Sequence, residues 1–131
     1  MLEIDEKIRS LLSSDSTLQT LLGGTATTKK VYPSLPNQDE SFPCITYENT
    51  GSRENTTPAS TQQTDYDIHI YTKTSYDELS QITERVKTLL KYYHSASPRI
   101  FHIVKTNEVN QNEDDRQLFT KVIQFTVWSY I

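Results

Sequence analysis

The chain has 131 residues, of which 34% are hydrophobic, and a formal net charge of −4. This size suits a single domain, residues 1–131, with one modest core. The negative charge argues against a basic footprint for duplex nucleic acid, and the single cysteine excludes an internal disulfide or a Cys-based metal site. No apolar run is long enough to span a bilayer, and the acidic N-terminus is unlike a signal peptide, so we expect no membrane contact and synthesis in the cytoplasm.

Apolar spacing predicts two helices in the first segment. One covers residues 3–13, with four apolar residues on one face of a 3.6-residue period: Ile4, Ile8, Leu11 and Leu12. A second, shorter helix carries Leu18, Leu21 and Leu22, with Ser14 or Asp15 as its cap. Gly23 and Gly24 end it, because a left-handed residue after a helix is least strained as glycine.

The central region predicts two extended pieces separated by prolines. Val31–Tyr32 stops at Pro33, and residues 33–43 form an irregular connection. Cys44–Asn49 follows as a strand, in which we interpret Cys44 as a small buried side chain rather than a nucleophile. Residues 50–61 contain almost no apolar side chain, which indicates a flexible polar loop or a long hairpin tip.

A strand over residues 62–71 and a helix over residues 75–93 form the best-specified unit. The strand alternates between an apolar face (Thr64, Tyr66, Ile68, Ile70) and a polar face (Gln63, Asp65, Asp67, His69, Tyr71). Ser75 and Glu78 predict a capping box at the start of the helix. Its apolar stripe comprises Leu79, Ile82, Val86, Leu89, Leu90 and Tyr93.

The last segment predicts two strands, over residues 99–106 and 117–130, that form a hairpin. Between them, residues 107–116 form a flexible acidic connection. Glu113, Asp114 and Asp115 are consecutive and lack the spacing of a calcium loop, so we interpret them as a solvated turn. The element order predicts an α+β domain with a mainly antiparallel or mixed β-sheet and helices packed on one face.

The sequence carries no motif for catalysis or for a cofactor. It has three glycines, two of them adjacent, and no phosphate loop, nucleophile elbow or zinc motif. The three histidines, His69, His94 and His102, fall on different elements. We therefore expect no catalytic residues, no metal and no cofactor.

Five segments together resemble the tail-completion or tail-terminator proteins of long-tailed bacteriophages or prophages. They are Val31–Pro33, Phe42–Glu48, Tyr66–Tyr71, Tyr76–Leu90 and Phe125–Trp128. The resemblance implies a structural virion protein that forms a ring, often a hexamer, on the last ring of the tail tube. That ring would join the tail to the head-completion, or stopper, protein. DNA would pass through its lumen without sequence-specific binding.

A ring of identical subunits needs two different contact patches on each subunit. The polar residues predict a candidate assembly surface made of Asp65, Asp67, His69, Tyr71, Arg53, Glu54, Glu113, Asp114 and Asp115. The implied location is the head-proximal end of the tail in the virion, after assembly in the host cytoplasm. Two alternatives stay open at this point: an adaptor domain that binds one partner, and a small-ligand enzyme that uses His69 or His102.

Overall fold

The computed structural model describes residues 2–23, 31–33, 43–55, 61–73, 75–91, 93, 95–96, 99–111 and 118–130. Within them lie three helices, α1 (Leu2–Ser13), α2 (Ser16–Leu22) and α3 (Tyr76–Leu90). The strands are β1 (Val31–Pro33), β2 (Cys44–Asn55), β3 (Thr61–Thr72), β4 (Ser95–Ala96), β5 (Arg99–Asn110) and β6 (Phe119–Tyr130). No described helix is both long and apolar enough to cross a membrane.

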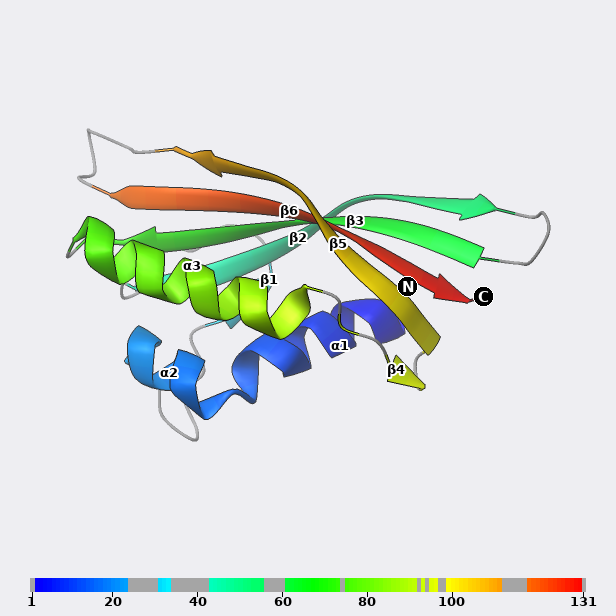
Figure 1. Cartoon of the computed structure of the whole chain (residues 1–131), viewed down its shortest axis with the longest axis horizontal. Helices are drawn as coiled ribbons and strands as arrows, with labels where there is room; N and C mark the ends of the chain where they lie inside the picture. Colours follow the sequence, from blue (N-terminus) through cyan, green and yellow to red (C-terminus); the bar gives the residue numbers. More distant parts are fainter. Residues whose placement is uncertain are drawn as a thin grey trace.

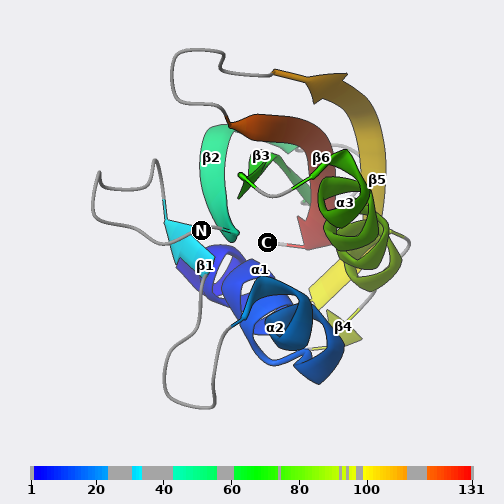
Figure 2. The same cartoon turned by 90° about the vertical axis from the view of Figure 1, so that its left-hand side faces the viewer.

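One six-stranded sheet, in the order β1-β2-β3-β6-β5-β4, forms the framework. β1 pairs with β2 in parallel, and every other neighbouring pair is antiparallel. The helices lie on one side of the twisted sheet (Figure 1), and the turned view shows the strands curving around them (Figure 2). The predicted α+β class with a mainly antiparallel or mixed sheet is confirmed.

The core lies between the helices and the apolar face of β3 and β6. Tyr66, Ile68 and Ile70 are buried, and their partners across the strand pair include Phe125 and Ile123. The alternation that predicted this face is physically strict, because successive side chains of a strand point to opposite sides. The Tyr66 hydroxyl donates a hydrogen bond to the Asp5 carboxylate, which ties β3 to α1. Burial raises the pKa of Tyr66, and the bond to Asp5 raises it further.

Helix α3 covers β3 and β6 with the predicted stripe. Leu79, Ile82, Val86 and Leu90 are buried, whereas Leu89 and Tyr93 are partly buried at its border. The Ser75 side chain caps the helix by accepting from the Glu78 amide at 3.1 Å. The Glu78 carboxylate accepts a hydrogen bond from the Thr72 hydroxyl at 2.7 Å, so it also links the helix to the end of β3.

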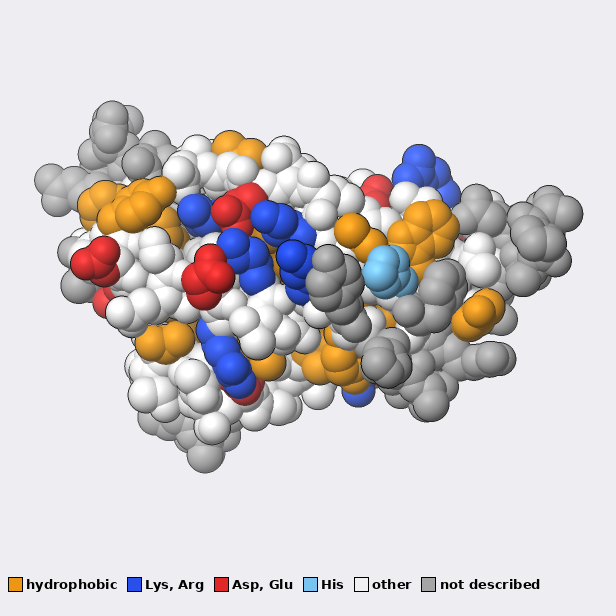
Figure 3. Space-filling view, viewed as in Figure 1, with side chains coloured by type: hydrophobic (Ala, Val, Ile, Leu, Met, Phe, Trp, Pro, Cys, Tyr) orange, Lys and Arg blue, Asp and Glu red, His pale blue; other side chains and the backbone are white. Residues whose placement is uncertain are grey.

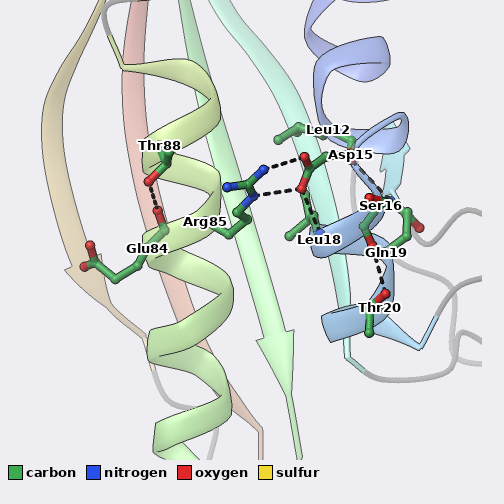
Figure 4. Close-up of polar contacts among 9 residues, drawn as sticks. All are labelled: Leu12, Asp15, Ser16, Leu18, Gln19, Thr20, Glu84, Arg85 and Thr88. Carbon is green, nitrogen blue, oxygen red and sulfur yellow. Dashed lines mark hydrogen bonds and ion pairs between the residues drawn. The ribbon is translucent and has the colours of Figure 1, made fainter.

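Asp15 links helix α2 to helix α3. Its carboxylate caps α2 by accepting from the Leu18 amide at 2.8 Å, and it receives two hydrogen bonds from Arg85 of α3 at 2.6 and 2.8 Å (Figure 4). The hydrogen bond from Arg85 lowers the pKa of Asp15, against the opposing effect of burial. Gly23 ends α2 with φ 73°, the left-handed conformation that glycine adopts without strain.

Replacing Asp15 by alanine is expected to lower the free energy of unfolding by about 1–2 kcal/mol at pH 7, since it removes a helix cap. Because the folded pKa of Asp15 is lowered, its contribution is full above the unfolded pKa of about 3.9 and is lost as the pH falls through the folded pKa. Urea unfolding of both proteins from pH 7 to pH 2 measures this. If Asp15→Ala lowered the free energy of unfolding equally at pH 7 and at pH 2, the expected pH dependence would be contradicted. Glu6→Ala, on the exposed side of α1, is the matched control.

Two predicted loops belong in part to strands. Residues 50–55 continue β2, in register with β3 through pairs such as Ser52↔Thr64 and Arg53↔Gln63. Residues 107–110 likewise continue β5 against β6. Both stretches are polar because they lie at exposed ends of long strands, where pairing of the backbone does not require apolar side chains. Of the rest of the two predicted loops, residue 61 belongs to β3, and residues 56–60 and 112–116 lie outside the described residues.

Candidate functional site

The sheet face turned away from the helices, here called the outer face, carries the polar residues of β3. Asp65, Asp67 and His69 are half-buried on it. Their partners on β6 are Thr126, Gln124 and Val122, in that order. The predicted strand alternation therefore places the three residues in one row on one face.

Asp65 is the best-anchored of these residues. Its carboxylate accepts a hydrogen bond from the Thr126 hydroxyl at 2.9 Å, and its backbone carbonyl accepts from the Thr50 hydroxyl at 3.3 Å. Together with Arg53, Gln63, Asp67 and Thr106 it lines a shallow polar hollow. The hollow is built of hydrogen-bonding groups from neighbouring strands, which suits a polar contact with another macromolecule.

Tyr71 lies on the outer face but offers almost no surface. It is 4% exposed, packs with Cys44 and Leu118 in a small second cluster, and stacks on His69 with ring centroids 6.0 Å apart. Tyr71 therefore adds almost no accessible area to the candidate assembly surface, because strand alternation gives the direction of a side chain and not what covers it. Cys44 is fully buried, as predicted.

The other predicted surface residues divide between locations. Arg53 is exposed and shares the hollow with Asp65. Glu54 is exposed at the next position of β2, so its side chain points to the opposite, helix-bearing side of the sheet. Glu113, Asp114 and Asp115 lie outside the described residues.

The structure does not bring His69 and His102 together. His69 is paired across the sheet with Val122, and His102 with Trp128. These two partners are six residues apart on β6, which corresponds to roughly 20 Å along a strand. The two histidines therefore do not form one cleft.

A charged cluster between α3 and β5 was missed by the sequence reasoning. Lys87 forms ion pairs with Glu84 at 2.9 Å and with Glu108 at 3.0 Å, and Lys121 lies 3.9 Å from Glu108. Figure 3 shows several lysine and arginine side chains at the centre of the view, with acidic side chains beside them. Glu84 and Lys87 are three residues apart on α3, whereas Glu108 falls in the segment 107–116 that the sequence predicts as a loop.

The electrostatics of this cluster are mutually stabilising. The hydrogen bond to Glu84, followed by that to Glu108, raises the pKa of Lys87. Burial alone would raise the pKa of Glu108, but the hydrogen bond and charge of Lys87 outweigh it and leave that pKa lowered. The cluster therefore stays charged at neutral pH and holds the C-terminal half of α3 on β5.

The family model described as "Tail completion protein gp17" matches residues 6–130 of the chain. The chain belongs to this family of tail completion proteins. As a member of it, the chain is a structural protein of a phage-type tail, and the resemblance seen in the sequence is confirmed. No curated protein matches the chain.

A solved structure supports the same fold for this tail completion protein. A chain in the "Virion of native gene transfer agent (GTA) particle" matches with a TM-score of 0.71 and 13% sequence identity. The match covers 93% of this chain and 90% of that chain. At this identity the likeness concerns the fold: a curved sheet with helices on one side.

Proposed function

We propose that copies of this chain form a closed ring, six subunits in number, that caps the tail tube and joins the tail to the head-completion protein. The match of the tail completion family over residues 6–130 carries this proposal. The ring ends the growth of the tube because its free face no longer offers the surface to which tube subunits add. Its role is binding and no chemical step is involved.

The subunit has the asymmetry that a closed ring requires. Head-to-tail contacts use two different patches of each subunit. Here the outer face presents a polar hollow around Asp65, while the helix side presents the charged cluster of Lys87, Lys121, Glu84 and Glu108. The two differ in chemistry, so contact between unlike patches is favoured over contact between like ones.

The net charge of −4 is compatible with a lumen through which DNA passes. Like charge opposes retention of the phosphate backbone, and non-specific binding to DNA depends on clustered cations facing it. DNA would thus move through the ring without sequence-specific contacts. The virion, at the head-proximal end of the tail, is the proposed location, with assembly in the host cytoplasm.

Deleting the gene from the phage or prophage tests the function. The expected result is filled heads without tails, together with tail tubes of abnormal length, as seen by negative-stain microscopy of the lysate. Expression of the chain in trans should restore tailed particles of uniform length. Tails of normal length joined to heads in the absence of the chain would overturn the proposal.

A further inference from the structure

The sheet has two long strand edges that are paired on one side only. β1 covers β2 at Ile45–Tyr47, and β4 covers β5 at Arg99–Ile100. In the part of the chain that the structure describes, the rest of β2, from Glu48 to Asn55, and the part of β5 from Ile103 to Asn110 form strand pairs only on the inward side. Figure 1 shows both strands at the borders of the long four-stranded part.

Such edges expose backbone donors and acceptors that can pair with another chain. Proteins normally blunt them with short strands, bulges or charged side chains. Here both strands are twelve residues long, and each has one bulge in its free part, between Asn49 and Gly51 on β2 and between Lys105 and Asn107 on β5. An exposed edge of this length therefore needs either a pairing partner or charged side chains that disfavour pairing with the wrong chain.

The two edges carry different charge. Lys105 stands on β5 beside Lys87 and Lys91 of α3, around a hollow that is also lined by Glu84, the ion-pair partner of Lys87. The free part of β2 carries Glu48 and Glu54, which are both exposed. Arg53 directly precedes Glu54. Glu108 of β5 is already paired with Lys87 and Lys121, so pairing β5 with β5 of another copy would bring the two Lys105 side chains near each other without a free acidic partner. Charge therefore favours β5 against β2.

Strand direction agrees with this choice. The four long strands alternate in direction across the sheet, since β2·β3, β3·β6 and β6·β5 are all antiparallel. A copy related by rotation about an axis along the strands keeps the same directions. Its β2 would then run antiparallel to β5 of the first copy, and the alternation would continue without a break.

We propose that the β5 edge of one subunit pairs with the β2 edge of a second copy, so that the sheets continue from subunit to subunit. The proposal rests on the ring described above and names its contact. Matching faces restrict the register to steps of two residues. Lys105 and Glu54 both point to the helix side, and Asn107 and Arg53 both point to the outer face. Among these registers, charge favours the one that sets Lys105 opposite Glu54. With Thr106 as the extra residue of the bulge on β5, Asn107 then lies opposite Arg53.

Cross-linking in tails purified from the virion tests this contact. Arg53→Cys combined with Asn107→Cys should, with a short bismaleimide, give a ladder of covalent multimers on a denaturing gel. The linker tolerates a register slip of about two residues, roughly 7 Å. Each single variant should give no ladder. The pair Glu6→Cys with Asn107→Cys, which keeps one position and moves the other to α1, is the matched control.

A charge exchange provides the second arm. Lys105→Glu and Glu54→Lys should each lower the infectious titre by at least about tenfold, and the double variant should recover most of it. Tailed particles that contain the chain but give neither the ladder nor the recovery would overturn the edge contact and leave the ring intact. Failure of the ring itself would instead appear as normal tails in the deletion strain.

Discussion

Replacing Phe125 by alanine is expected to lower the free energy of unfolding by about 3–5 kcal/mol, the range for removing a large buried aromatic side chain. Phe125 is 1% exposed at the middle of β6, opposite Tyr66 of β3, under the helices. The loss is large because the surrounding strands are held in register and cannot collapse into the space. The total free energy of unfolding of a folded domain is about 5–15 kcal/mol, so this variant approaches the limit at which the domain still folds.

Chemical denaturation followed by circular dichroism measures the effect, with the midpoint shifting and the slope unchanged. Tyr130→Ala is the matched control, because Tyr130 lies near the end of the same strand and is 42% exposed. Its expected change is within about 0.5 kcal/mol. If the two variants unfolded at the same denaturant concentration, Phe125 would not be the core residue described.

Replacing Asp67 by arginine is expected to lower the infectious titre by at least about tenfold while the fold is retained. Asp67 is half-buried in the outer-face hollow, and its neighbours in the register are Glu48 and Gln124. Arginine beside Glu48 replaces a pair of like charges by a favourable one, so the subunit itself is not destabilised. A partner docked on this polar face would meet the reversed charge.

Two measurements separate assembly from folding for Asp67→Arg. The thermal unfolding midpoint of the purified chain should equal that of the parent protein, and the plaque assay should show the loss. Glu6→Arg makes the same charge change on the exposed side of α1 and should leave the titre unchanged. Equal titres for both variants would remove Asp67 from the candidate surface.

The sequence was sufficient for those elements whose pattern is set by burial. Alternation gave the inward face of β3, and the stripe with its Ser75 cap gave α3. It failed at residues 50–55 and 107–110, which are polar and yet belong to strands. Their strand conformation comes from pairing with β3 and β6, a long-range contact that no local pattern of side chains records.

The candidate surface was only partly predictable for the same reason. Asp65 and Asp67 were assigned to the correct face because side chains alternate along a strand. Tyr71 is buried against Cys44, at the start of β2, and Leu118, directly before β6. Both residues are far from Tyr71 in the sequence. The ion pairs of Glu108 with Lys87 likewise exist only once β5 lies under α3.

Averaged cryo-electron microscopy images of tails isolated from a strain that makes no heads test the proposed ring most directly. We expect one closed ring of six copies of this fold at the end of the tube, with β5 of each subunit beside β2 of the next. Finding this fold along the length of the tube or at its distal tip, with the head-proximal end capped by another protein, would contradict it.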